Sequence, residues 1–410
     1  MKLDTKAMRY LSSEDWRVLA AVEQGSKNHE VVPTPLINQI SGLRGGSGVH
    51  KCISSLAKVG LIARVPNAKY DGYRLTYGGL DYLALNAHRK GNAIYSVGNQ
   101  IGVGKESDIY VVASSSGIQH VLKIHRLGRI SFRTVKANRD YLRNRSSTSW
   151  MHMSRLAAMK EYAFMQALHK AGFPVPTPVA QNRHTIVMEL IDAFPLRQIS
   201  TVPDPGSLYD ELINMIITLA RHGLIHGDFN EFNILIREDP PPGEPAHEQS
   251  DQAPQTSQIP QKSTSLTTPP PPTASATLTA IMIDFPQMIS IDHANADFYF
   301  GRDVQCIARY FRRRYDFVAD AEPPSLGEAL QGGKAVLPRE LRLDLAVEAS
   351  GFSRKMAREL EAYRRKVGAE GDVGAAEGGG EVEKEEDADE EEDEEEEAGE
   401  AQDGDPHVPY

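Results

Sequence analysis

The chain has 410 residues, with 40% hydrophobic and 25% charged residues, a composition that fits a folded protein of two or more domains. Its two cysteines, Cys52 and Cys306, lie far apart in sequence, which argues against a disulfide framework and favours a reducing compartment. No secretory signal and no apolar run of the roughly 20 residues that cross a bilayer is visible, so we expect no membrane partner. The net charge of −11 divides into −19 on residues 369–405 and +8 elsewhere, so an acidic tail follows a basic body that suits a nucleic-acid or ribonucleoprotein partner.

The first 92 residues predict a winged-helix domain. Apolar residues recur at helical spacing in 14–24 and 33–40, and a Gly-rich turn leads into a third helix at 49–59. Strands at 61–65 and 72–76 then form a hairpin. The third helix is expected to bury Val49, Cys52, Ile53, Leu56 and Val59. The helix and hairpin are expected to present His50, Lys51, Ser54, Ser55, Lys58, Arg64, Lys69 and Arg74, either to a nucleic-acid backbone or to a protein.

A second domain begins with strand, turn and strand at 98–112, where Gly102, Gly104 and Ser107 punctuate the turn. A third strand at 121–124 carries Lys123 between apolar neighbours. Burying an ammonium group is costly unless it is paired, so we expect a partner carboxylate. The helix predicted at 156–168 offers Glu161 for that role.

The stretch 126–145 holds seven Arg and Lys residues and one acid, Asp140. Charge alone does not separate a solvated loop or helix face from a flexible arm that contacts RNA. Both interpretations stay open.

Three apolar segments follow, each ending at polar residues. The strand at 185–191 includes Met188, Glu189 and Ile191, and a helix at 208–220 precedes the turn that holds Asp228 and Asn233. The strand at 281–283 ends in Asp284, a carboxylate suited to Mg²⁺. Residues 239–280, rich in Pro, Ser, Thr and Gln, predict a disordered insertion whose ends lie close together.

The ordered series of motifs resembles the RIO family of atypical serine/threonine protein kinases. It consists of Gly102-x-Gly104-Lys105-Glu106-Ser107, Lys123, Glu161, Met188-Glu189, His226-Gly227-Asp228-x4-Asn233 and Ile283-Asp284-Phe285-Pro286. The winged helix is similar to the type-two branch, and the match covers residues 1 to 315. The resemblance implies an α+β fold, in which an N-terminal winged-helix domain precedes a trimmed bilobal protein-kinase-like domain and a disordered acidic tail.

The domain limits that follow are a winged helix at 1–92, an N-lobe at 93–190 with a basic flexible loop at about 126–148, a C-lobe at 191–320 with the insertion at 239–280, a helical segment at 321–368 and a tail at 369–410.

The family also implies a role for each matching residue. Gly102, Gly104, Lys105 and Ser107 resemble the loop that covers the phosphates of ATP, and Lys123 and Glu161 resemble its ion pair. Met188, Glu189 and Ile191 resemble the adenine-binding hinge. Asp228 resembles the catalytic Asp, Asn233 and Asp284 the Mg²⁺ ligands, and Asp284 is implicated as acceptor of a transient phosphate.

By resemblance we expect an ATP- and Mg²⁺-dependent kinase or ATPase that acts as a switch in maturation of the small (40S) ribosomal subunit, with autophosphorylation. Its expected partners are the pre-40S particle, ribosomal RNA and ribosomal proteins, in the cytoplasm or shuttling through the nucleus. Gly227 replaces the usual Arg, so the anchor for a phosphorylated activation loop is absent. The short segment between Asp284 and the acidic tail argues against a large peptide-binding platform. A catalytically idle nucleotide-bound scaffold and a DNA-binding regulator are the alternatives.

Two features remain open. Asp303 either tethers the catalytic loop or begins a helix. Leu337, Leu341, Leu343 and Leu345 have the spacing of a nuclear-export segment or of a helix packed on the body.

Overall fold

The computed structural model describes residues 3–43, 46–65, 72–128, 148–239, 277–330, 338, 342–350 and 352–367. Contacts group residues 1–369 into one unit and residues 370–410 into a second. The acidic tail, most of the 239–280 insertion and most of the basic stretch lie outside the described residues. Among the helices that are described, none is long and apolar enough to cross a membrane.

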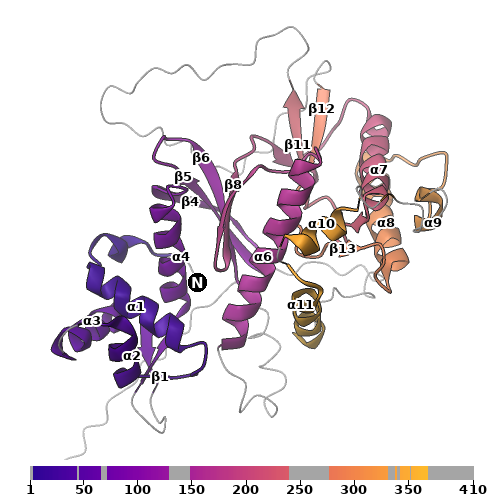
Figure 1. Ribbon diagram of the computed structural model, residues 1–410. Helices are drawn as coiled ribbons and strands as arrows, with labels where there is room; N and C mark the ends of the chain where they lie inside the picture. Colours follow the sequence, from indigo (N-terminus) through magenta and orange to yellow (C-terminus); the bar gives the residue numbers. More distant parts are fainter. Residues whose placement is uncertain are drawn as a thin grey trace, which may run out of the picture. The chain divides into compact units, whose positions relative to one another are not determined.

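The N-terminal domain has the predicted order of three helices followed by a hairpin (Figure 1). Helix α1 begins at a capping box, in which Ser12 and Asp15 each accept the other's backbone N–H. Helix α3 buries four of the five predicted apolar residues, but Val59 is 45% exposed because the helix has ended at Lys58. The elements are η1 (Lys6–Arg9), α1 (Ser13–Gly25), β1 (Val32–Pro33), α2 (Thr34–Ser41), α3 (Gly46–Lys58), β2 (Ile62–Arg64) and β3 (Gly72–Leu75), with sheet order β1-β3-β2.

A fourth helix, α4 (Tyr77–Lys90), is not predicted from the sequence. Thr76 caps its first turn by accepting the N–H of Gly79. Nine of its residues are buried, including Asp81 and His88, so it has no simple apolar stripe. The helix packs on α1 and also contacts the strand β7 (Pro178–Asn182), and it therefore connects the first domain to the next sheet.

The second domain opens with a five-stranded antiparallel sheet in the order β4-β5-β6-β8-β7. In β5 (Ser107–Ala113) buried residues alternate with partly exposed ones, as expected of a strand with one face on the core. Helix α6 (Thr148–Lys170) packs on this sheet, and its Trp150 reaches back into the core of the N-terminal domain. The other strands are β4 (Ser96–Val103), β6 (Gln119–His125) and β8 (Thr185–Glu189).

The following lobe is mainly helical and has its own core, in which Phe229, Phe285 and Phe300 are almost fully buried. Strand β11 (Ile234–Asp239) pairs with β12 (Thr277–Met282) from Ile234↔Met282 to Asp239↔Thr277. The predicted closeness of the insertion's ends is confirmed, but residues 277–280 belong to the strand rather than to the insertion. The other elements are β9 (Phe194–Pro195), η2 (Leu196–Gln198), α7 (Pro205–Arg221), β10 (Leu224–Ile225), β13 (Ile289–Ser290) and α8 (Ala296–Tyr315).

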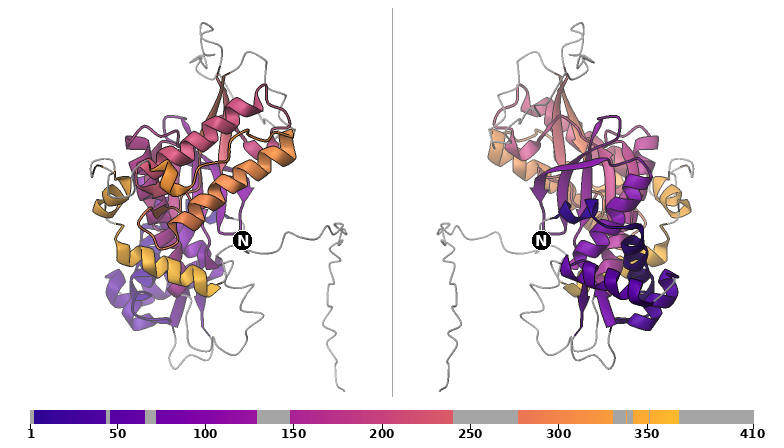
Figure 2. Two further views of the ribbon diagram at one scale, coloured as in Figure 1. Left: turned by 90° about the vertical axis from the view of Figure 1, so that its right-hand side faces the viewer. Right: turned by 90° about the vertical axis from the view of Figure 1, so that its left-hand side faces the viewer.

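Three further helices follow: α9 (Leu326–Ala329), α10 (Leu343–Ala349) and α11 (Arg354–Val367). Leu343 packs against the C-lobe core, which favours the packed-helix interpretation over an export segment, although Leu337 and Leu341 lie outside the described residues. Helix α11, at the yellow end of the colour scale in Figure 2, lies against α6, and Leu360 shares a buried cluster with Leu156.

Candidate active site

Lys123 stands between two carboxylates. Its Nζ lies 2.6 Å from Glu161 Oε1 and 2.6 Å from Asp284 Oδ1. Strand β6 supplies the lysine, α6 supplies Glu161, and Asp284 follows the end of β12. The expected pairing of Lys123 with Glu161 is confirmed. Asp284 is 161 residues distant in sequence and joins the same cation.

Burial and charge act in opposite directions on this cluster. Burial by itself lowers the pKa of Lys123, but the two carboxylates outweigh it and the pKa is raised. The pKa of Glu161 is lowered, since Lys123 and His125 together overcome the effect of burial. His125 Nε2 lies 2.9 Å from Glu161 Oε2. No motif in the sequence singles out His125, although it lies two residues from Lys123 and hence on the same face of the strand.

The loop after β10 folds around Asp228. Its Oδ1 accepts a hydrogen bond from Asn230, and Asn233 Nδ2 donates both to Asp228 Oδ2 and to the Asp228 carbonyl, at 3.0 and 2.9 Å. Burial, followed by the nearby charge of Asp284, raises the pKa of Asp228. With its amide hydrogens directed at Asp228, Asn233 has its oxygen left as a ligand for a hard cation.

Asp303 in α8 anchors this loop through its carboxylate. Its two carboxylate oxygens accept the backbone N–H groups of Gly227 and Phe229 at 2.8 and 3.0 Å. The tether predicted as one of two roles for Asp303 is therefore confirmed. Burial raises the pKa of Asp303 to about 7. Gly227 has φ +77°, and an added Cβ would lie 2.9 Å from the Gln287 carbonyl oxygen, so the position that holds Arg in most kinases accepts only glycine without rearrangement.

Asp284 occupies the left-handed region, with φ +71°, a conformation that is uncommon for residues other than glycine and is enriched for Asp and Asn. Its side chain remains 41% exposed. Burial would raise the pKa of its carboxyl, but Lys123 outweighs that effect and lowers it. The next residue, Phe285, is fully buried against His226, with ring centroids 5.9 Å apart. This packing fixes the backbone next to Asp284, which precedes Phe285, and next to Asp228, which follows His226 by two residues.

The predicted phosphate-covering loop connects β4 to β5. Gly104 N–H donates to the Ser107 carbonyl at 2.7 Å, which closes the turn, and the Lys105 side chain is exposed. Gly102 faces Ile109 across the strand pair. Glu106 extends to the C-terminal helix, where Arg364 donates to its Oε2 at 2.9 Å.

The predicted hinge lies at the end of β8, where Met188 is buried. The Glu189 N–H donates to the Thr177 carbonyl, and the Ile191 carbonyl accepts from Ala193. The Glu189 N–H is therefore occupied within the protein, whereas the Ile191 carbonyl keeps a second lone pair. That backbone groups of Glu189 and Ile191 bind adenine stays a prediction, for groups other than the Glu189 N–H.

Arg364 is a site residue that the sequence does not indicate. Its guanidinium donates to Glu106 before β5 and to the Pro286 carbonyl after Asp284, at 2.9 and 3.0 Å. Helix α11 thereby connects the two sides of the site. The separation of 258 residues between Arg364 and Glu106 leaves no local pattern from which the contact could be read.

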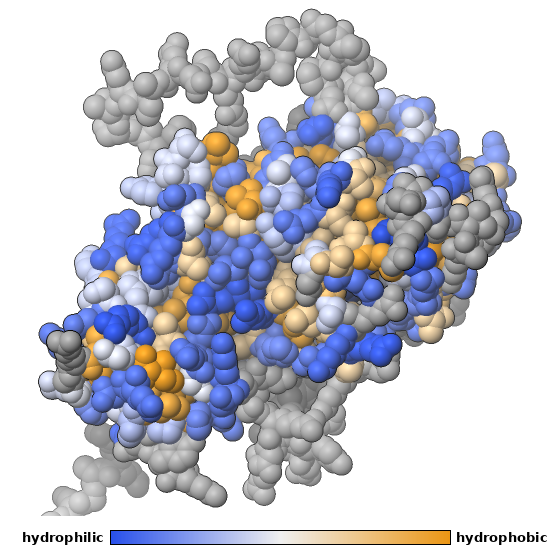
Figure 3. Space-filling model, viewed as in Figure 1, coloured by the Kyte–Doolittle hydropathy of each residue, from blue (hydrophilic) through white to orange (hydrophobic). Residues whose placement is uncertain are grey.

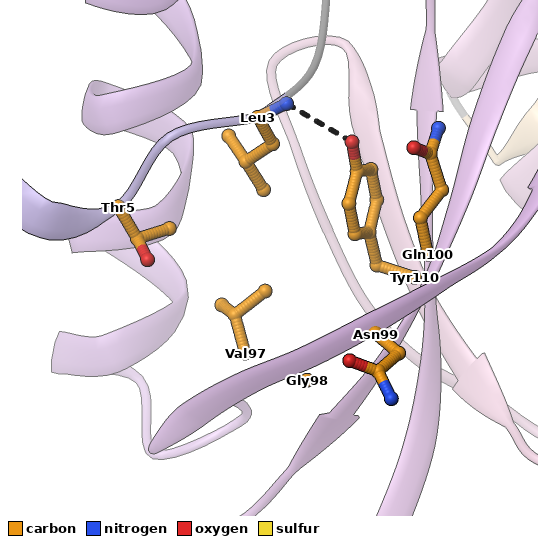
Figure 4. Close-up of a pocket in the computed structure, with 7 residues that line it drawn as sticks. All are labelled: Leu3, Thr5, Val97, Gly98, Asn99, Gln100 and Tyr110. Atoms are coloured by element: carbon orange, nitrogen blue, oxygen red, sulfur yellow. Dashed lines mark hydrogen bonds between the residues drawn. The ribbon is translucent and has the colours of Figure 1, made fainter. Parts of the chain in front are cut away.

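A separate cavity of about 370 Å³ lies between the N-terminal segment and strands β4 and β5. Leu3 N–H donates to the Tyr110 hydroxyl at its edge, and Val97, Asn99 and Gln100 complete the wall (Figure 4). None of the predicted catalytic or metal-binding residues lines it. Among the described residues no cluster of three or more His, Cys, Asp or Glu could hold a metal unaided. Asn233 and Asp284 suit Mg²⁺, which usually takes few protein ligands together with phosphate oxygens.

Comparison with known proteins agrees with this geometry. The RIO domain model matches residues 108–242 and 275–323, and the "Rio2, N-terminal" model matches residues 8–91. The break between 242 and 275 falls within the insertion.

The serine/threonine-protein kinase rio2 of Schizosaccharomyces pombe is 52% identical over 366 residues, covering 89% of this chain and 93% of the relative. Its counterpart in Saccharomyces cerevisiae is 47% identical and is covered over 78% of its length. The crystal structure of the Rio2 kinase–ADP/Mg²⁺–phosphoaspartate complex from Chaetomium thermophilum superposes with a TM-score of 0.76 at 60% identity, covering 90% of this chain and 99% of that one. The predicted combination of winged helix and kinase-like domain is confirmed, and the chain belongs to the Rio2 branch of the RIO family of atypical serine/threonine protein kinases.

Proposed function

We propose that this chain is an ATP- and Mg²⁺-dependent kinase and ATPase that transfers the γ-phosphoryl group to Asp284 and acts as a nucleotide switch in maturation of the small (40S) ribosomal subunit. The observation that carries the phosphoryl-transfer step is the placement of Asp284. Its carboxylate is partly exposed beside Lys123, in a backbone conformation fixed by the buried Phe285. The phosphoaspartate in the related Chaetomium thermophilum Rio2 structure supports an aspartate as acceptor.

In the proposed step, an Asp284 carboxylate oxygen attacks the γ-phosphorus, and the bond from that phosphorus to the oxygen bridging it to the β-phosphate breaks. ADP leaves with the electron pair, and an acyl phosphate forms on Asp284. Lys123, kept charged by its carboxylate partners, would hold the phosphates in line. Asn233 and Asp284 would hold Mg²⁺, whose charge offsets that of the phosphate oxygens.

Water then completes the cycle by attacking the phosphorus of the acyl phosphate, which releases inorganic phosphate and regenerates the Asp284 carboxylate. Asp228 is placed to orient that water and to accept its proton. Its raised pKa makes it a better proton acceptor than an exposed aspartate.

The position of α11 favours hydrolysis or self-phosphorylation over phosphorylation of a large protein. Arg364 spans from Glu106 to the Pro286 carbonyl, so the helix lies where the residues flanking Asp284 meet the phosphate-covering loop. A protein substrate would have to displace these contacts in order to bring a hydroxyl to the site.

The proposed partners are the pre-40S particle, with its ribosomal RNA and proteins, met in the cytoplasm with or without shuttling through the nucleus. Support comes from the N-terminal domain, whose exposed α3 residues include His50, Lys51 and Lys58. The surface drawn over this domain in Figure 3 is largely hydrophilic, with a small hydrophobic patch.

Trapping the covalent intermediate tests the phosphoryl-transfer proposal. After incubation with γ-labelled Mg-ATP and acid quenching, the wild-type chain should carry label that hydroxylamine releases, and Asp284→Ala should carry none. Asp228→Ala should form the label but turn it over more slowly. Label that resists hydroxylamine, as a phosphoserine does, or that persists in Asp284→Ala would rule out Asp284 as acceptor. Absence of phosphate release above an Asp228→Ala background would support an idle scaffold instead.

A further inference from the structure

A second buried ionic cluster lies just beyond the active site, at the end of strand β6. The Arg126 guanidinium donates through its two terminal nitrogens to both oxygens of Asp81, at 2.8 and 2.7 Å, and through Nε to Asp108 at 3.2 Å. These three residues are each no more than 2% exposed. The prediction that Arg126 begins a solvated or RNA-binding basic stretch is therefore wrong, because two carboxylates on other elements bury and pair it.

The cluster joins the two domains. Asp81 belongs to α4 of the N-terminal domain, whereas Asp108 lies in β5 of the kinase-like sheet and Arg126 directly follows β6. Asp81 Oδ1 also lies 2.8 Å from Nε2 of His184, which is fully buried. A bidentate contact between a planar guanidinium and a carboxylate fixes both distance and orientation, so α4 determines where the Arg126 side chain lies.

The same arginine holds the predicted phosphate-covering loop. Its backbone N–H donates to the Glu106 carbonyl at 2.5 Å, and Asp108, which its Nε contacts, is the second residue of β5 after that loop. Glu106 and Asp108 thus flank Ser107, and both accept hydrogen bonds from Arg126. On the preceding positions of β6, Lys123 and His125 contact Glu161. One short segment therefore positions the loop on one side and the lysine–glutamate pair on the other.

We propose that Asp81 is a positioning residue for nucleotide binding: through Arg126, this side chain of the winged-helix domain fixes the loop that covers the phosphates. Asp81 touches neither nucleotide nor metal in this arrangement. Its effect is to hold the Arg126 side chain where Nε contacts Asp108, while the Arg126 backbone N–H holds the Glu106 carbonyl. The N-terminal domain is then a structural part of the ATP site as well as a surface for partners.

A second ion pair across the same interface provides a matched control. Glu23 in α1 pairs with Arg183 at 2.6 Å, where both side chains are about one-fifth exposed. Arg183 lies in the turn between β7 and β8, and within the described part of the chain its guanidinium donates to Glu23, to Asn182 and to the Leu83 carbonyl. Loss of this pair would loosen the interface without a direct path to the phosphate-covering loop.

The inference rests on the proposed nucleotide function, so the experiment first requires that the full-length wild-type chain bind ADP with Mg²⁺. Asp81→Asn is expected to weaken ADP–Mg²⁺ binding about tenfold, whereas Glu23→Gln should change it less than about twofold. At saturating ATP the single-turnover rate of Asp81→Asn should stay within about twofold of wild type, because the reacting groups are untouched. Hydrogen exchange at the Arg126 amide should be faster in Asp81→Asn and unchanged in Glu23→Gln.

Arg126→Lys is the second variant, for use if Asp81→Asn fails to fold. A lysine keeps the charge but cannot bond both carboxylates as a fork, so ADP binding should weaken in the same direction by a smaller factor. If wild type binds ADP–Mg²⁺ and both cluster variants bind it as tightly as Glu23→Gln does, the positioning role is wrong. If wild type itself does not bind, the nucleotide function fails rather than this inference. A fall in the saturated single-turnover rate with unchanged ADP affinity would also overturn it.

Discussion

At the scale of single residues, the candidate site is organised by side chains that satisfy several partners at once. Lys123 pairs with two carboxylates, Asp303 accepts two backbone N–H groups, and Arg126 pairs with two further carboxylates. Each is buried, so removal of one partner leaves another polar group without compensation. Such residues specify one arrangement of the loops around Asp228 and Asp284.

Sequence patterns located the residues of this site that lie within motifs and missed those that act across the fold. Lys123 could be predicted to need a carboxylate because an ammonium inside an apolar strand must be paired. Arg126 could not be separated from the basic run that follows it, because charge pattern carries no information about Asp81, 45 residues earlier. His125 and Arg364 could not be identified either, because their partners Glu161 and Glu106 are distant from them in sequence.

His88 supplies a prediction about stability and pH. Burial, with smaller effects of His184 and Arg183, lowers the pKa of His88 to about 4. Its Nε2 lies 2.8 Å from the Thr185 hydroxyl. Between the unfolded pKa near 6.5 and the folded value, the unfolded chain binds the proton in preference, so the contribution of this residue to stability is present above pH 6.5 and is lost as the pH falls.

Between pH 7 and pH 5, wild type should therefore lose roughly 2 kcal/mol of stability more than His88→Gln, which cannot titrate. Urea unfolding of both proteins at the two pH values measures the difference, and groups common to the two proteins cancel in it. Parallel losses in wild type and variant would mean that His88 titrates normally in the folded chain.

At the scale of elements, the strongly patterned ones were predicted, and those whose residues are buried on several sides were not. Strands β5, β6 and β8 and helices α6 and α7 follow from apolar spacing. Helix α4 could not be predicted, because Asp81 and His88 are buried together with the apolar residues around them and because two glycines, which disfavour helix, lie in its first turn. Helix α11 is strongly polar, and only its contacts with α6 and with the site reveal why it forms there.

Arg364 in α11 links Glu106 to the Pro286 carbonyl, so Arg364→Ala should loosen both sides of the site and speed the dissociation of ADP about three- to tenfold. Stopped-flow release of a fluorescent ADP measures that rate. Glu359→Gln is the control, because Glu359 joins the same helix to α6 through His152 at 3.1 Å, in a pair of side chains that are almost half exposed. Equal release rates for the two variants would exclude a specific role for Arg364.

At the scale of the whole molecule, charge is distributed unevenly along the chain. Residues 1–93 hold 13 Lys and Arg against 7 Asp and Glu, whereas residues 369–405 carry a net charge of −19. The order of domains and the family could be predicted from sequence because the motifs occur in one fixed succession. The contacts that join the two domains could not be predicted from sequence, because the Asp81–Arg126 and Glu23–Arg183 pairs connect residues that are 45 and 160 positions apart.

The proposed ribosomal partner makes a prediction at this scale. If the exposed face of α3 contacts RNA phosphates, affinity for structured ribosomal RNA should fall steeply with salt, and Lys51→Glu should weaken binding and reduce the magnitude of the salt slope by about one. Lys27→Glu makes the same charge change at an exposed position of the same domain, just beyond α1. If only net charge matters, the two variants should bind the RNA with equal affinity. If α3 contacts the RNA directly, Lys51→Glu should bind more weakly than Lys27→Glu. Filter binding of the full-length chain at several salt concentrations separates the two cases, and stronger binding to one duplex DNA sequence than to the RNA would favour the DNA-binding alternative.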